Sequence, residues 1–153
     1  MPKNEDTVRW IDRKELHNVE ESFHEMTGMS IATVDTEGNL LTENPGRLEF
    51  CDGLINLSEK AAKLCRQCAL YGAKESYDLK RGVPYYCPMG LTEFAMPVVI
   101  EDKTAAYLVG GRVFEVKPSE EALRERARYY GIDGEALIKA AGEVPVAGTE
   151  AVR

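Results

Sequence analysis

The sequence lacks the features that direct a chain to nucleic acid or to a membrane. Its formal net charge is −7, and its 19 basic residues are interspersed with 26 acidic ones. No basic stripe is therefore present to neutralise phosphates or anionic lipids. The longest apolar run, near Phe94 to Ile100, is too short to span a bilayer or to form the core of a signal peptide. We expect a cytoplasmic protein with no direct nucleic-acid or membrane partner.

The common signatures of catalysis are also missing. The sequence has no G-x-S-x-G, H-E-x-x-H, Walker loop or G-x-G-x-x-G. Its two histidines, His17 and His24, would need further ligands to bind a metal, and we interpret them as solvated or interface side chains. Acidic residues are scattered over helical faces, where they are usually solvated. The sequence therefore favours a protein that is not an enzyme.

A chain of 153 residues with ordinary apolar content is expected to close one hydrophobic core. We divide it into a flexible N-terminal segment over residues 1–13, one folded domain over 14–146, and a C-terminal tail over 147–153. No kinase, cyclase or DNA-binding segment follows that tail. We therefore expect either an excised sensor or a module that signals by contact.

Hydrophobic periodicity and turn residues predict helices and two groups of strands. The first helix carries Leu16, Val19, Phe23 and Met26 at helical spacing. The expected elements are a helix over 12–28, a hairpin of strands 30–35 and 39–42, a helical stretch over 49–55, a long helix over 59–79 after an N-cap at Ser58, strands over 84–87, 93–100 and 105–116, and helices over 117–132 and 133–144. Strands that arrive in hairpin groups favour an α+β architecture: a PAS-like, mostly antiparallel sheet with helices packed on it.

The four cysteines raise the question of a metal centre. Their spacing is C-x13-C-x2-C-x18-C, and Cys65 and Cys68 lie three residues apart on one predicted helix, where they share a face. If the fold also brings Cys51 and Cys87 to this pair, four thiolates could hold zinc or a [4Fe-4S] cluster, and the sequence does not decide between the two. Two alternatives stay open, namely buried free thiols and a redox-active dithiol or disulfide in "CRQC".

Two other features suggest a ligand pocket. The stretch "LVGGRVFEV" places two glycines inside a strand, which indicates either a β-bulge or the close approach of another group. The apolar side chains before it are core residues by default, but residues of this type also line small-molecule pockets. The candidate pocket residues of this second group are Tyr85, Tyr86, Phe94 and Met96.

Four motifs, in order, resemble the PocR ligand-binding sensory domain. They are "FC" at Phe50 and Cys51, "CRQC" over 65–68, "YYCPMGLTEFAMPV" over 85–98 and "LVGGRV" over 108–113. The likeness runs from about Glu15 to Val146, and "CPMGL" with its upstream cysteines is the most specific part. The resemblance implies a variant of the PAS-like fold that senses small hydrocarbon derivatives, such as short diols or methylated compounds. It also implies an output module, namely a kinase, a cyclase or a DNA-binding module.

The resemblance further identifies Cys51, Cys65, Cys68 and Cys87 as the recurrent cysteines of the family and as the characteristic centre of the sensor. It draws attention to Gly111 and Arg112, because this chain has Gly-Arg-Val where the family often has Gly-Gln-Val. A cation in place of a neutral amide favours a carboxylate or another anionic ligand, such as a small acid.

Our leading interpretation is a non-enzymatic sensor domain in which a small ligand, or the state of a cysteine-bound centre, shifts the sheet and the terminal helices between two arrangements. We expect a homodimer, because PAS-like modules commonly pair through their terminal helices. Two alternative functions stay open: a thiol redox enzyme that uses "CRQC", and a zinc-stabilised interaction module without a small ligand.

Overall fold

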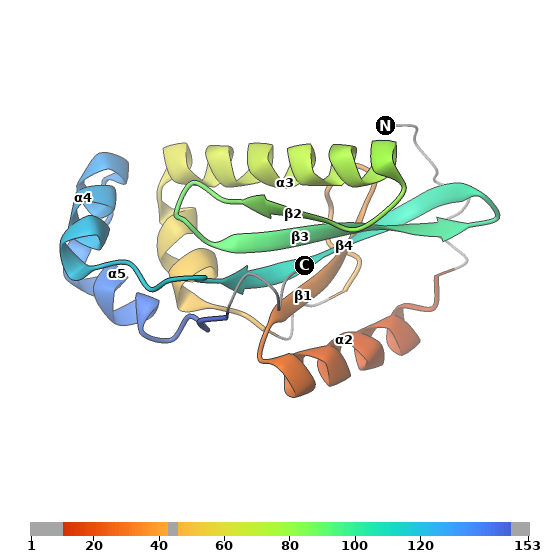
Figure 1. Cartoon of the computed structure of the whole chain (residues 1–153), viewed down its shortest axis with the longest axis horizontal. Helices are drawn as coiled ribbons and strands as arrows, with labels where there is room; N and C mark the ends of the chain where they lie inside the picture. The colour runs from red at the N-terminus through yellow and green to blue at the C-terminus, as the bar shows by residue number, and fades with distance from the viewer. Residues whose placement is uncertain (1–10, 43–45, 148–153) are drawn as a thin grey trace.

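The computed structural model describes residues 11–42 and 46–147. They form a four-stranded sheet of order β1-β4-β3-β2 in which every neighbouring pair is antiparallel, with helices packed on it (Figure 1). This arrangement confirms the predicted α+β, PAS-like architecture. The elements are α2 (Arg13–Thr27), β1 (Ser30–Asp35), the π-helical turn η1 (Glu49–Leu54), the 3-10 turn η2 (Ile55–Leu57), α3 (Glu59–Leu79), β2 (Val83–Tyr86), β3 (Thr92–Ile100), β4 (Lys103–Val113), α4 (Glu120–Tyr130) and α5 (Gly134–Ala141).

Side-chain caps fix where the helices begin. The Ser58 hydroxyl accepts a hydrogen bond from the Ala61 amide at 3.2 Å, as the predicted N-cap requires. Ser119 caps α4 in the same way, and Asp12 and Asp133 cap α2 and α5. Because these short polar residues precede apolar periodic runs, sequence alone locates the starts of the helices well.

The hairpin of β3 and β4 contains a tight turn at one end and an irregularity in strand pairing at the other. Its two-residue turn has φ of 50° at Glu101 and 62° at Asp102, which suits the right-handed twist of the two strands. At the other end, Thr92 pairs with Val113 but Glu93 pairs with Gly111, so Arg112 is an extra residue in β4. This β-bulge is the first of the two interpretations offered for the glycine pair, and it is confirmed.

The predicted N-terminal hairpin is wrong in its second half. After the turn at Asp35, residues 39–42 make an isolated bridge between Val34 and Leu40 and no strand. The Thr33 amide donates to the Thr42 hydroxyl at 3.1 Å rather than to a backbone carbonyl, so a side chain ends the ladder. The sheet consequently has four strands within the described residues, one fewer than expected.

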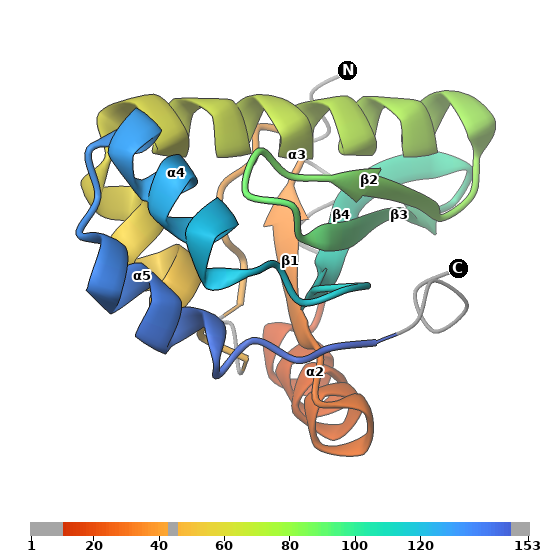
Figure 2. The ribbon, with the colours of Figure 1, turned by 60° about the vertical axis from the view of Figure 1, so that its left-hand side comes forward.

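The helices cover the sheet unequally. α3 lies along one face and α2 lies against β1 on the opposite face, while α4 and α5 pack at one end beside the N-terminal part of α3 (Figures 1 and 2). At that end a continuous apolar core joins η1, the β2–β3 loop and the C-terminal helices. Its largest members are Phe50, Ile55, Met89, Leu91, Phe114, Leu123 and Leu137.

The predicted apolar stripe of α2 is only partly buried. Val19 and Met26 are exposed at 64% and 85% of their surfaces, whereas Glu20 is buried. Glu20 Oε1 accepts hydrogen bonds from the hydroxyls of Thr33 at 2.5 Å and Thr42 at 2.8 Å. A polar contact therefore sets which side of α2 faces the sheet, and periodicity of apolar residues could not reveal it.

Ordered structure extends slightly beyond both predicted domain boundaries. α2 begins at Arg13, so the predicted flexible segment 1–13 includes one helical residue, and residues 1–10 lie outside the described part. Ala147, the first residue of the predicted tail, donates its amide to the Phe114 carbonyl at 2.9 Å, and residues 148–153 also lie outside the described part. Within residues 11–42 and 46–147, no helix has the length and apolar character needed to cross a membrane.

Gly110 should not tolerate a side chain. A Cβ at this position would collide with the Ser30 carbonyl of the neighbouring strand and lie 3.0 Å from the Phe94 ring. Gly110→Ala is therefore expected to lower the free energy of unfolding by about 1–3 kcal/mol in denaturant titration. Gly134→Ala, where the nearest atom is 3.7 Å away, is the matched control and should leave stability unchanged or slightly higher. Equal effects of the two changes would contradict the close approach of β1 and β4.

Candidate functional site

The candidate site lies between α3 and the sheet and consists of two adjoining cavities. The central cavity has a volume of about 330 Å³, and its walls come from all four strands, η1, η2 and α3. The thiol cavity has a volume of about 70 Å³ and is walled by η1, α3 and the Cys87–Leu91 loop. Both cavities are lined by Asp52, Asn56, Cys65, Glu93 and Arg112.

A charged trio occupies the junction of these cavities. Arg112 Nη1 lies 3.0 Å from both carboxylate oxygens of Asp52, and Arg112 Nε lies 3.8 Å from Glu93 Oε1. Asp52 is fixed in turn because its Oδ2 accepts the Leu48 amide at 2.9 Å. Burial opposes the charge of Arg112, but the neighbouring Cys51, Asp52 and Glu93 raise its pKa, so the guanidinium stays charged.

Glu93 is a buried acid in a mainly apolar wall. Burial raises its pKa above the ordinary value of 4.5, although Arg112 and a hydrogen bond with the Tyr85 side chain oppose this shift. Burial raises the pKa of Tyr85 as well, so its hydroxyl stays protonated. The pair of Tyr85 and Glu93 thus offers a hydroxyl and a carboxyl group to an occupant of the central cavity.

The charged trio limits the ability of Arg112 to bind an anionic ligand. Its guanidinium already faces two carboxyl groups, and the three side chains together carry a net charge between 0 and −1, depending on the protonation of Glu93. An anion would have to displace Asp52 and come close to Glu93. The geometry therefore does not favour the anionic ligand that the sequence suggested for Arg112.

The structure brings three of the four cysteines to one place. Cys51, Cys65 and Cys87 line the thiol cavity. Cys68 lies instead in a shallow groove at the edge of the sheet, the edge groove, which is lined by Leu64, Gln67, Cys68, Tyr71, Pro84, Tyr85 and Tyr86. Cys65 and Cys68 share a helix, as predicted, but Cys65 lines the thiol cavity and Cys68 lines the edge groove.

The thiols are protonated at neutral pH. Burial raises the pKa of Cys51 to about 12 and that of Cys65 to about 11, and it also raises the pKa values of Cys87 and Cys68. In every case nearby Glu93 or another negative group adds to the effect of burial. Low-pKa thiolates are required of a redox dithiol, and these surroundings do not provide them.

The arrangement does not fit a four-thiolate metal centre. In the described part of the chain, no group of three or more histidine, cysteine, aspartate or glutamate side chains is arranged to hold a metal ion. The donor type suits zinc or a [4Fe-4S] cluster, but Cys68 faces the edge groove and not the thiol cavity. The zinc or iron–sulfur cofactor on these four cysteines stays a prediction.

The residues predicted to bind a ligand lie in three different places. Tyr85 and Arg112 line the central cavity, and Gly111, with φ of 97°, forms the bulge that places Arg112 there. Tyr86 lies in the edge groove. Phe94 follows Glu93 in β3 and therefore points to the opposite face, where its ring contacts Phe23 of α2 at 6.2 Å between centroids.

Met96 lies on that same opposite face, two residues beyond Phe94, and is 45% exposed. Phe94 and Met96 therefore lie on the face opposite to the central cavity, and their role in ligand binding stays a prediction. Apolar alternation shows which residues share a face but not which face covers a cavity.

Three polar residues of the site were missed from the sequence: Asp52, Asn56 and Glu93. Glu93 carried a readable signal, because it is a charged residue inside an otherwise apolar strand, between Thr92 and Phe94. Asp52 and Asn56 had none, since they belong to short helical turns whose orientation depends on tertiary packing. A π-helical turn such as η1 is itself frequent at functional sites.

The order of thiol modification tests the state of the cysteines. At pH 8, we expect Cys68 to react with iodoacetamide well before Cys51 and Cys65, because burial and raised pKa values keep the latter two protonated. Mass spectrometry of the folded protein after timed alkylation measures the order. Fast reaction of Cys65 would support a redox dithiol. Protection of all four thiols until a chelator is added, together with stoichiometric zinc or iron, would support the metal centre.

Glu93 should make stability depend on pH. Its folded pKa lies above its unfolded value, so its contribution is fully present below about pH 4.5 and is lost as the pH rises through the folded pKa. Glu93→Gln does not titrate, so its stability relative to the wild type should increase over this interval. Denaturant titrations from pH 4 to pH 8 measure the difference, with exposed Glu125→Gln as the matched control. A difference for Glu93→Gln that is constant with pH would contradict the raised pKa.

Comparison with known proteins agrees with this geometry. The family described as "Sensory domain found in PocR" matches residues 9–153. The Regulatory protein PocR of Salmonella typhimurium is 24% identical over 98 residues, which cover 64% of this chain and 32% of that protein. The matched region thus spans about a third of that relative's length. These findings support a signal-sensing regulatory role, and the chain belongs to the PocR sensory domain family.

Proposed function

We propose that this domain is a non-enzymatic sensor that binds a small neutral or cationic polar molecule in the central cavity. The observation that carries the proposal is the charged trio of Asp52, Glu93 and Arg112, in which the cation is already paired. Glu93 and the neighbouring Tyr85 line a cavity of about 330 Å³. A concave site with a few buried polar groups in an apolar wall is typical of small-molecule recognition.

The charge of the trio narrows the ligand class. A diol can donate one hydrogen bond to Glu93 and another to the Tyr85 oxygen, whose own proton is engaged with Glu93, and a methylated ammonium ion is attracted by the net negative charge when Glu93 is ionised. A small acid gains neither interaction and meets Asp52 and Glu93 instead, and Arg66, the other cation of the lining, is exposed to solvent. Short diols and methylated compounds are therefore favoured over small acids.

Binding of a ligand in the central cavity can be transmitted directly to the C-terminal end of the domain. Phe114 follows the bulge by two residues, its ring packs against Phe50 of η1 at 5.7 Å between centroids, and its amide donates to the Pro145 carbonyl at 2.9 Å. A ligand that shifts Arg112 or η1 would thus displace the chain that leaves α5. A sensor of this kind needs only a difference in ligand affinity between two arrangements.

A second route leads through the Cys87–Leu91 loop. Cys87, Met89 and Leu91 line the thiol cavity, and the Met89 carbonyl accepts a hydrogen bond from Arg126 of α4 at 2.6 Å. Movement of this loop would therefore reach α4. An output kinase, cyclase or DNA-binding module beyond the domain, a homodimer and a cytoplasmic location are further predictions of this proposal.

The alternatives have weaker support. The raised thiol pKa values speak against a redox enzyme that uses "CRQC". A zinc-stabilised interaction module needs four convergent thiolates, and it gives no reason for the buried trio beside a cavity. Neither accounts for the joint presence of Glu93, Tyr85 and Arg112.

A ligand panel tests the proposal. Isothermal titration with short diols, methylated amines and short carboxylates is expected to give binding by a diol or an amine and none by the carboxylate of the same size. A saturating ligand at about 100 times its Kd should stabilise the protein by about 2.7 kcal/mol in a parallel unfolding experiment.

Two variants test whether the ligand binds in the central cavity. Ala62→Phe fills part of the central cavity from α3 and should abolish binding, whereas Ala136→Phe on α5 should not. Absence of binding across the panel, or preferred binding of the carboxylate, would contradict the proposed function.

A further inference from the structure

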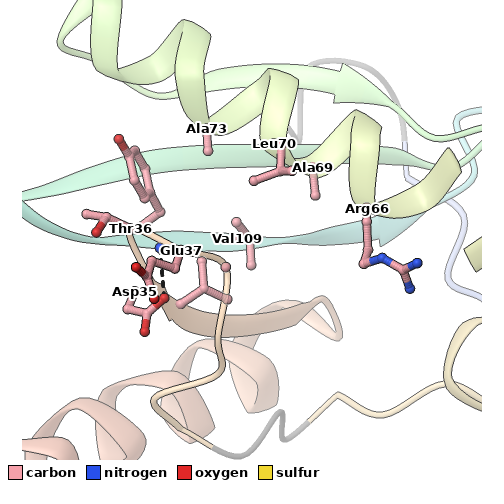
Figure 3. Close-up of a pocket in the computed structure, with 11 residues that line it drawn as sticks. Asp35, Thr36, Glu37, Arg66, Ala69, Leu70, Ala73 and Val109 are labelled. Carbon is pink, nitrogen blue, oxygen red and sulfur yellow. Dashed lines mark hydrogen bonds between the residues drawn. The ribbon is translucent and has the colours of Figure 1, made fainter. Parts of the chain in front are cut away.

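A third cavity, here called the apolar cavity, adjoins the central one. Figure 3 shows it between α3 and the sheet, with Ala69, Leu70 and Ala73 above it, Val109 below it and the turn that begins at Asp35 beside it. Its volume is about 140 Å³. Four residues, Val34, Arg66, Ala69 and Val109, line both this cavity and the central cavity, so the two are neighbours along the same face of the sheet.

Small side chains create this space. Ala69 and Ala73 are one helical turn apart on the side of α3 that faces the sheet, and buried Tyr107 and Val109 of β4 lie opposite them. Protein interiors rarely keep gaps larger than a water molecule, and a cavity of about 150 Å³ lined by apolar side chains stays dry and binds benzene. The apolar cavity is of similar size, and it opens to solvent beside the exposed residues Leu70 and Gly38.

Of the polar groups around it, the Asp35 carboxylate is already engaged, and the exposed Arg66 side chain lies at the border with the central cavity. The Asp35 carboxylate accepts hydrogen bonds from the Glu37 amide at 2.9 Å, the Asn39 amide at 2.9 Å and the Asn39 side chain at 3.2 Å. These bonds outweigh burial and lower its pKa. Asp35 therefore shapes the turn, and the cavity offers mainly hydrocarbon surface to an occupant.

We propose that the ligand is amphiphilic, with a polar head beside Glu93 and Tyr85 in the central cavity and a hydrocarbon tail of about four to six carbons in the apolar cavity. This inference rests on the proposed function and extends it to the class of ligand. The apolar cavity determines specificity for tail length. Each methylene group that enters it should raise affinity about fourfold, because burial of one methylene is worth about 0.8 kcal/mol.

A series of 1,2-alkanediols from three to nine carbons tests this inference by isothermal titration. For the wild type, affinity should rise about fourfold with each added carbon and then level off when the cavity is full. Ala73→Leu fills the apolar cavity and should keep the binding of the shortest diol while it removes the dependence on length. Ala122→Leu, on α4, is the matched control and should keep that dependence.

A second variant tests the same inference independently, in case Ala73→Leu does not fold. Leu70→Ala enlarges the cavity at a half-exposed position and should move the plateau to longer tails. Equal affinity for all lengths in the wild type, or the same dependence on length in Ala73→Leu as in the wild type, would overturn the tail site while leaving the proposed function intact. Failure of every diol to bind at any length would also overturn the tail site, whereas the proposed function would fall only if the methylated amines of the panel did not bind either.

Discussion

One irregularity in the sheet, the bulge at Gly111 and Arg112, is the constraint on which the site depends. The extra residue in β4 directs a long cation into the space beneath α3, where a charge without partners would cost several kcal/mol. Asp52 of η1 and Glu93 of β3 supply those partners. A single guanidinium thus holds together three elements that are far apart in the sequence, and the cavity lies where they meet.

The same trio sets the chemistry of its surroundings. Burial raises the pKa values of Glu93 and of the three thiols of the thiol cavity, and the guanidinium, already paired with Asp52, does not reverse these shifts. Protonated groups in an apolar wall are hydrogen-bond donors rather than nucleophiles. The electrostatics therefore agree with recognition of a ligand and give little support to thiol turnover.

Much of the fold could be predicted from the sequence, because caps, turns and strand patterns are local. Ser58 located the start of α3, and the predicted strands over 93–100 and 105–116 located the hairpin of β3 and β4. The failures are nonlocal: a Thr42 side chain ended a strand, and a buried Glu20 reoriented α2. For the site, the glycine pair indicated a bulge, but only the fold could show that Arg112 meets Asp52, or that Cys68 turns away from the other thiols.

The two terminal parts of the domain are attached by different forces, and this difference bears on how a signal leaves the cavity. α2 contacts β1 and the segment after it through hydrogen bonds of Glu20 with Thr33 and Thr42, and β3 through the ring of Phe23, while its Val19 and Met26 side chains are exposed. The C-terminal helices share a close-packed apolar core with η1 and the Cys87–Leu91 loop. Packed interiors transmit displacement because they compress little, and the apolar core at the C-terminal end adjoins the thiol cavity directly. A change in the cavity wall is therefore passed more directly to α4, α5 and the chain beyond them than to α2.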